Sequence, residues 1–154
     1  MRVAIVYLSV HHGNTERVAK AIAEVLKASL FSPRQVDVEA LHGYDLIGFG
    51  SGIYFQRHHR TLLDFVEGLP VFEGKKAFIF STRGMGPAGL YHKPLRKRLL
   101  KKGFEVVGEF SCRGFDTVGP LKLFGGMNKG RPNEEDLEKA RSFAERLKAE
   151  IEGG

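Results

Sequence analysis

The chain has 154 residues, of which 42% are hydrophobic and 27% are charged, a composition typical of one globular domain rather than a disordered or fibrous protein. Its 24 basic and 18 acidic residues leave a net charge of +6, which suits an acidic partner or an anionic ligand. A single cysteine, Cys112, excludes an internal disulfide. Because no apolar run approaches the roughly 20 residues of a membrane span, we expect one cytoplasmic domain over residues 1–154.

Five strands are expected along the chain. Continuous apolar runs at residues 3–8, 45–50 and 76–81 predict central parallel strands, because such strands are buried on both faces. Residues 104–110 alternate in polarity, which is typical of an edge strand. Residues 35–40 also alternate, but too few residues follow them for a parallel connection to the next strand. We therefore place the second strand at 28–31 and the crossover at 32–43.

Helical patterns occur at residues 14–27, 57–67, 89–102 and 133–151. In the third of these, Leu95, Leu99 and Leu100 are expected to pack inward, and its basic residues then form a solvated face rather than a nucleic-acid site. The alternation of strands and helices predicts an α/β fold with a doubly wound, five-stranded parallel sheet.

Ligands of doubly wound sheets bind beyond the carboxyl ends of the strands. Three loops leave the middle strands there: "SVHHGNT" from Ser9, "SGIYFQRHH" from Ser51 and "STRGMGPAGLYH" from Ser81. The first has the composition of an anion site, because Gly13 allows close approach of the backbone and the next helix begins with free N–H groups. A simple glycine turn before a capped helix is the alternative.

Aromatic residues in the second and third loops offer flat faces to a ring system: Tyr54, Phe55 and Tyr91. Backbone amides could reach the polar edge of the same ring at Ser51, Gly52, Gly84 and Gly86. An anion site beside aromatic loops indicates a mononucleotide with a large ring.

The segments "VYLSVHHGNTERVAKAIAEVL", "YDLIGFGSGIYF", "GKKAFIFSTRG" and "KGFEVVGEF" resemble the flavodoxin family, and the likeness extends over essentially the whole chain. This resemblance implies a flavodoxin-like sheet with strand order 2-1-3-4-5 and FMN as cofactor. It also implies that Gly13, Asn14 and Thr15 hold the phosphate. Tyr54, Phe55 and the loop at 82–86 would then face the isoalloxazine ring.

The first loop departs from the family pattern. Hydroxyls expected at positions 10 and 12 are replaced by Val10 and His12, and a hydroxyl stands at Ser9 instead. We therefore expect imidazole and backbone groups to meet part of the phosphate. The predicted cofactor-binding residues are Ser9, His11, His12, Gly13, Asn14, Thr15, Ser51, Gly52, Ile53, Tyr54, Phe55, Thr82, Arg83, Gly84, Met85 and Tyr91.

Three functions are compatible with these residues. The first is an FMN-binding carrier that moves electrons between redox proteins, and its partners are expected to be acidic because the chain is basic. The second is an FMN-dependent oxidoreductase acting on a quinone or tetrapyrrole-like substrate. The third is a flavin-free binding module. No general acid or base stands out, which favours the carrier, working as a monomer or homodimer.

Several other motifs receive simpler interpretations. "GMGPAG" at 84–89 with Glu109 matches a dinucleotide fingerprint, but it follows the fourth strand and Pro87 removes an amide. A receiver domain would need an acidic pair just after the first strand and an aspartate after the third strand, where this chain has "SVHHG" and "GSGIY". The histidines at 11–12, 58–59 and 92 are expected to be solvated or to face phosphate rather than to bind metal.

Cys112, just past the fifth strand, is expected to be buried and structural. The segment at 112–132 could cover a site edge or dock a partner.

Overall fold

The computed structural model describes residues 1–10, 13–84, 86–114 and 130–153. Its parallel sheet has the order β2-β1-β3-β5-β6, which is the predicted order of the five parallel strands. The strands are β1 (Val3–Leu8), β2 (Ser29–Phe31), β3 (Leu46–Tyr54), β5 (Lys76–Arg83) and β6 (Glu105–Arg113). An additional short strand, β4 (Arg57–His58), pairs antiparallel with the end of β3.

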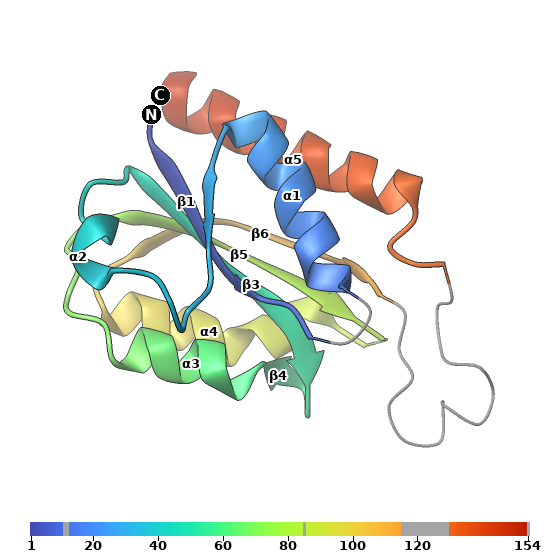
Figure 1. Ribbon diagram of the computed structural model, residues 1–154, viewed down its shortest axis with the longest axis horizontal. Helices are drawn as coiled ribbons and strands as arrows, with labels where there is room; N and C mark the ends of the chain where they lie inside the picture. The colour runs from blue at the N-terminus through green and yellow to red at the C-terminus, as the bar shows by residue number, and fades with distance from the viewer. Residues whose placement is uncertain (11–12, 85, 115–129, 154) are drawn as a thin grey trace.

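Helices cover both faces of the sheet, as Figure 1 shows. One face carries α1 (Asn14–Leu26) and α5 (Glu134–Gly153), and the other carries α3 (Arg60–Glu67) and α4 (Ala88–Lys101). A short helix, α2 (Val38–Leu41), lies in the expected crossover between β2 and β3. Within the described residues no helix has the length and apolarity needed to cross a bilayer.

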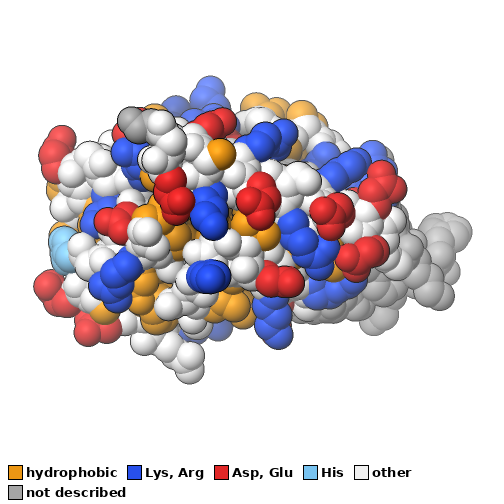
Figure 2. All heavy atoms as spheres, turned by 90° about the horizontal axis from the view of Figure 1, so that it is seen from above, with side chains coloured by type: hydrophobic (Ala, Val, Ile, Leu, Met, Phe, Trp, Pro, Cys, Tyr) orange, Lys and Arg blue, Asp and Glu red, His pale blue; other side chains and the backbone are white. Residues whose placement is uncertain are grey.

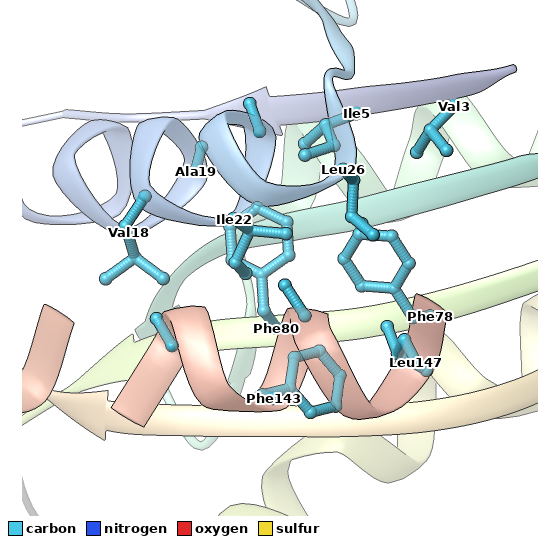
Figure 3. Packing of buried hydrophobic residues seen from close by; sticks show 14 of the residues in the cluster. Val3, Ile5, Val18, Ala19, Ile22, Leu26, Phe78, Phe80, Phe143 and Leu147 are labelled. Carbon is cyan, nitrogen blue, oxygen red and sulfur yellow. The ribbon is translucent and has the colours of Figure 1, made fainter. Parts of the chain in front are cut away.

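Aromatic rings of β5 fill the core beneath α1 and α5. Phe78 and Phe80 meet Ile22 and Leu26 of α1 and Phe143 of α5 in this layer (Figure 3). The Phe78 and Phe80 rings lie over Gly48 and Gly50 of β3. A Cβ added at Gly48 would come within 2.2 Å of the Phe78 ring, and one at Gly50 within 2.3 Å of the Phe80 ring. Gly48 and Gly50, in the second apolar run, are therefore packing residues.

Three strands extend further than the sequence predicted. Backbone pairing continues past the apolar runs, with Ser51 opposite Ser81 and Gly52 opposite Thr82. Ser51–Tyr54 therefore belongs to β3 rather than to a loop, and α3 begins at Arg60 instead of residue 57. Cys112 lies inside β6 and is buried as expected.

The inward face of α4 was predicted partly wrongly. Leu95 and Leu99 are fully buried, but Leu100 has 54% of its surface exposed. Residues 95 and 99 are one helical turn apart and face the sheet together, whereas residue 100 is rotated by a further 100° or so toward solvent.

Candidate functional site

The first loop presents an open helix N-terminus. Gly13 is the N-cap of α1 in a left-handed conformation (φ 66°), and it supplies no side chain to cap the helix. A Cβ built on Gly13 would meet no atom within 4 Å among the described residues other than its chain neighbours, so this part of the structure leaves space beside the Gly13 backbone. Ser9 Oγ accepts a hydrogen bond from the Glu16 amide at 3.1 Å, and the Glu16 carboxylate pairs with Lys20 at 2.8 Å. These features leave a partial positive charge that suits an anion.

A pair of buried hydroxyls joins this loop to the middle of the sheet. Thr15 Oγ1 and Thr82 Oγ1 are 2.9 Å apart, and both residues are almost wholly buried. On the next strand, the Gly114 amide donates to the Arg83 carbonyl at 2.9 Å. A Cβ added at Gly114 would meet the Asn14 side chain at 2.7 Å. The ends of β5 and β6 therefore converge on the start of α1.

The second loop is a tight β-hairpin. Tyr54 of β3 is opposite Arg57 of β4, so that Phe55 and Gln56 alone form the turn. Both have positive φ angles, 50° and 65°, which are typical of a type I′ turn but are usually adopted by glycine or asparagine. The Phe55 side chain is 96% exposed. The hairpin therefore holds a bare aromatic ring at a strained position beside the strand ends.

Ser51 and its neighbours position this hairpin. Ser51 is fully buried, and its hydroxyl accepts from the His59 amide at 2.9 Å and donates to the Gly52 carbonyl at 2.7 Å. The Tyr54 ring lies edge-on to the His59 ring, with centroids 5.2 Å apart. Ile53, which is half-buried, pairs with His58 across the hairpin. Ser51 thus supports the loop from beneath, while the aromatic residues stand at its surface.

At the start of the third loop, the Arg83 side chain points toward the edge strand β6. Arg83 Nε donates to the Gly86 carbonyl at 2.9 Å, and Arg83 Nη1 donates to Ser111 Oγ at 2.7 Å. Gly86 has φ 101°, and a Cβ there would lie 2.1 Å from the Tyr91 hydroxyl. Tyr91 therefore packs over the glycine and shapes this loop. Gly84 lies at the start of the same loop.

Some predicted site residues lie outside the described residues. These are His11, His12, Met85 and most of the segment at 112–132, namely residues 115–129. The other predicted site residues lie at the carboxyl ends of β1, β3 and β5 or in the loops that follow them.

Two histidines expected at the surface are buried instead. His58 is fully buried, with Nε2 2.9 Å from the Phe80 carbonyl oxygen, and burial together with the neighbouring His92 lowers the pKa of His58 to about 3. His92 is 2% exposed, and its ring centroid lies 5.0 Å from that of His58. Among the described residues no group of three or more His, Cys, Asp or Glu side chains is arranged to hold a metal ion.

An acid–base cluster beside α4 was missed by the sequence analysis. His92 Nε2 lies 2.6 Å from Ser81 Oγ, and His92 Nδ1 lies 2.9 Å from Glu109 Oε1. Arg96 donates to both oxygens of Glu109 at 2.7 Å. Burial alone would raise the pKa of Glu109, but the hydrogen bonds from Arg96 and His92 outweigh it and hold that pKa below its usual value. Because Glu109 is engaged here, it is not positioned to bind a ribose after the 84–89 loop.

Comparisons with known proteins agree with this geometry. A family model described as "Flavodoxin domain" matches residues 4–114. The chain is 48% identical over 148 residues to a Methanocaldococcus jannaschii protein named only as uncharacterized, covering 96% of this chain and 98% of that protein. Oxidised flavodoxin 2 from Bacillus cereus has a similar structure, with a TM-score of 0.72 at 23% identity over 97% of this chain and 99% of that one.

A flavodoxin described as coming from the domain Archaea is also similar, with a TM-score of 0.62 at 18% identity, covering 96% of this chain and 99% of that one. The fold, the strand order and the family match agree, and this chain belongs to the flavodoxin family. Membership of this family implies a flavin cofactor.

Proposed function

We propose that the protein binds FMN and transfers electrons between redox partners. The observation that carries this proposal is the convergence of two features at neighbouring strand ends. The N-terminus of α1, whose N-cap residue Gly13 has no side chain, follows β1, and an exposed aromatic turn at Phe55 follows β3, which pairs directly with β1. An anion site next to an aromatic surface matches a phosphate joined to a flat ring.

The phosphate end of the proposal depends on Gly13, Asn14 and Thr15. The described residues leave space for a phosphate to reach the Gly13 backbone, and the α1 dipole favours its charge. Thr15 is tied to Thr82, so its hydroxyl holds the start of α1 against β5 in addition to any contact with the ligand. The residues present therefore fit a phosphate group.

The ring end depends on the hairpin and on the loop after β5. Phe55 and Tyr54 supply aromatic faces, while Thr82, Arg83 and Gly84 approach from the neighbouring strand. Bound FMN would supply the redox chemistry, and the protein would supply orientation, stacking and charge. A flavin-free binding module would need neither the strained aromatic turn nor the open phosphate loop.

Purification of the protein and identification of any bound flavin test the proposal. We expect a yellow protein, or a colourless one that becomes yellow on addition of FMN, with one FMN released per chain on denaturation. Release of a different chromophore, or no uptake of FMN at millimolar concentration, would count against it.

An acidic partner is expected to dock on α4. This helix has five basic residues and no acidic residue. Arg96 and Arg98 pair with Glu109 and Glu67, whereas Lys93 and Lys97 are exposed and have no ion pair with another described residue. The opposite helical face, over α1 and α5, carries both signs of charge interspersed (Figure 2). The positive surplus is therefore stronger on α4, beside the proposed ring site.

Electron exchange with an acidic iron–sulfur protein tests this docking surface. The Lys93→Gln/Lys97→Gln variant should react more slowly at low ionic strength, and the difference should vanish near 1 M salt, where the Debye length is about 3 Å. A matched control, Arg146→Gln/Lys148→Gln, removes the same charge from α5. Equal slowing by both pairs would mean that net charge, and not the α4 surface, governs the encounter.

An FMN-dependent oxidoreductase acting on a quinone or tetrapyrrole-like substrate is the second candidate. The hydrogen-bonded pair of buried His92 and partly exposed Glu109 favours it, because a protein that only carries electrons needs no such acid–base group. Saturable turnover of a free quinone without a protein partner would support the oxidoreductase. Electron exchange that requires a redox protein would support the carrier.

A further inference from the structure

A pocket lies between α4 and β6, with a volume of about 290 Å³. Polar side chains line much of it: His92 and Arg96 from α4, and Glu109 and Ser111 from β6. Ala88 and Gly89, at the start of α4, add little bulk to the wall. The volume is just below the roughly 300–1,000 Å³ typical of ligand sites, so a ligand of one ring or smaller fits best.

A continuous line of hydrogen bonds runs from this pocket into the protein. Parallel pairing of β5 and β6 sets Ser81 opposite Ser111, and their hydroxyl oxygens are 2.7 Å apart. Ser81 Oγ also meets His92 Nε2 at 2.6 Å, and Arg83 Nη1 donates to Ser111 Oγ at 2.7 Å. Ser81 is fully buried and Ser111 is half-buried, so Ser111 is the end of the line that a ligand can reach.

The direction of each hydrogen bond follows from its neighbours. An ionised Glu109 only accepts, so His92 must carry its proton on Nδ1, which leaves Nε2 as an acceptor. Ser81 therefore donates to His92 Nε2 and accepts from Ser111. Ser111 in turn accepts from the Arg83 guanidinium. Each hydroxyl passes its hydrogen toward His92, and Ser111 keeps a lone pair for one more donor.

We propose that this pocket binds a small molecule with an acidic hydroxyl, of the phenol, enol or quinol class, and that the Ser111–Ser81–His92 line accepts its proton. The ligand O–H bond breaks as a Ser111 O–H bond forms, the Ser111 proton moves to Ser81, and the Ser81 proton moves to His92 Nε2. The products are a ligand oxyanion and an imidazolium. No electron is transferred and no other reactant is needed.

The surrounding charges balance both products. The ionised Glu109 would stabilise the imidazolium through Nδ1, and Arg96 orients that carboxylate. The oxyanion would lie near Arg83, which donates to two neutral acceptors, the Ser111 hydroxyl and the Gly86 carbonyl. Burial lowers the pKa of His92 and Glu109 opposes that effect, while His58 stays neutral beside it. Aliphatic alcohols are too weakly acidic to give up a proton to such a base, which selects the acidic hydroxyls.

Binding of 4-nitrophenol tests the proposal, because its neutral and ionised forms absorb at different wavelengths. At a pH one unit below the pKa of free 4-nitrophenol, we expect the bound ligand to be mostly ionised. This result corresponds to a lowering of the ligand pKa on binding by roughly one unit or more. In a weakly buffered solution with a pH indicator, no proton should be released to solvent, because His92 retains it.

The His92→Gln variant keeps an acceptor for Ser81 but cannot take up the proton. Its bound 4-nitrophenol should stay neutral, or should release one proton to solvent for each ligand that ionises. The Ser111→Ala variant, which changes a half-buried residue near the end of β6, should give the same result. It serves as the test if the His92→Gln variant does not fold. Arg146→Gln, on the opposite face, should behave as the wild type.

No binding of 4-nitrophenol would overturn the proposal, as would binding of the neutral form or release of one proton per ionised ligand by the wild type. The measurement does not involve flavin and can be made with or without it. Its failure would therefore leave the proposed FMN site untouched, and failure to bind FMN would leave this result standing.

Discussion

Replacement of Phe55 by asparagine is expected to stabilise the flavin-free protein and to weaken its binding of FMN. Phe55 has φ 50°, a left-handed conformation that costs most residues about 1–2 kcal/mol and that asparagine adopts more readily. The ring is 96% exposed, so its removal sacrifices almost no buried surface. We expect the free energy of unfolding to rise by about 1 kcal/mol, which for a chain of this length raises Tm by roughly 2–4 °C.

The same change removes an aromatic face from the proposed ring site. Aromatic pairs contribute about 0.5–1.5 kcal/mol beyond their buried area, so FMN affinity should fall by roughly two- to tenfold. Chemical denaturation followed by circular dichroism measures the stability, and flavin fluorescence measures the affinity. Phe55→Leu is the control, since leucine keeps the strained backbone but lacks the ring. This account of the turn would be refuted if Phe55→Asn did not stabilise the flavin-free protein, or if it left the FMN affinity unchanged.

Three further predictions concern buried polar groups. Thr15→Val or Thr82→Val alone should each cost about 1–3 kcal/mol by leaving one buried hydroxyl unpaired, and the double variant should cost less than the sum, as a denaturation cycle would reveal. The pKa of His58 falls from 6.5 to about 3 on folding, so the free energy of unfolding should decrease by about 1.4 kcal/mol for each pH unit below 6.5. The His58→Gln variant should show a flatter dependence of unfolding free energy on pH between about pH 4.5 and 6. An unchanged dependence would exclude His58 as its source. Burial raises the pKa of Cys112 to about 12, so thiol reagents at pH 8 should label the protein only on unfolding, and rapid labelling of the native form would contradict this burial.

The presence and approximate positions of the central strands could be predicted because they depend on patterns within short stretches of sequence, whereas the strand order followed from the resemblance to the flavodoxin family. Apolar runs identified β1, β3 and β5, and the glycine, amide and hydroxyl after β1 marked a helix start suited to an anion. The hairpin could not be predicted in the same way. Its turn uses Phe55 and Gln56, whereas the signal for such a turn is glycine or asparagine.

The acid–base cluster was missed for a different reason. Ser81, His92, Glu109 and Ser111 are separated in sequence, and they meet only because of the β5–β6 register and the face that α4 turns to the sheet. The serine pair is visible once the register is known, because residues 81 and 111 are opposite each other. Sequence patterns predict the strands but neither this register nor the face that α4 turns to the sheet. The burial of His58 and His92 therefore could not be foreseen.

Comparison of FMN with riboflavin as ligands tests the central claim most directly. The two differ in the phosphate, and the open N-terminus of α1 at Gly13 is the feature proposed to bind it. Fluorescence titration of the flavin-free protein should show FMN binding at least roughly tenfold more tightly than riboflavin, or about 1.4 kcal/mol. Gly13→Val should reduce that preference, because a β-branched residue resists the left-handed conformation. Equal affinity for the two flavins in the wild type would contradict the proposed site.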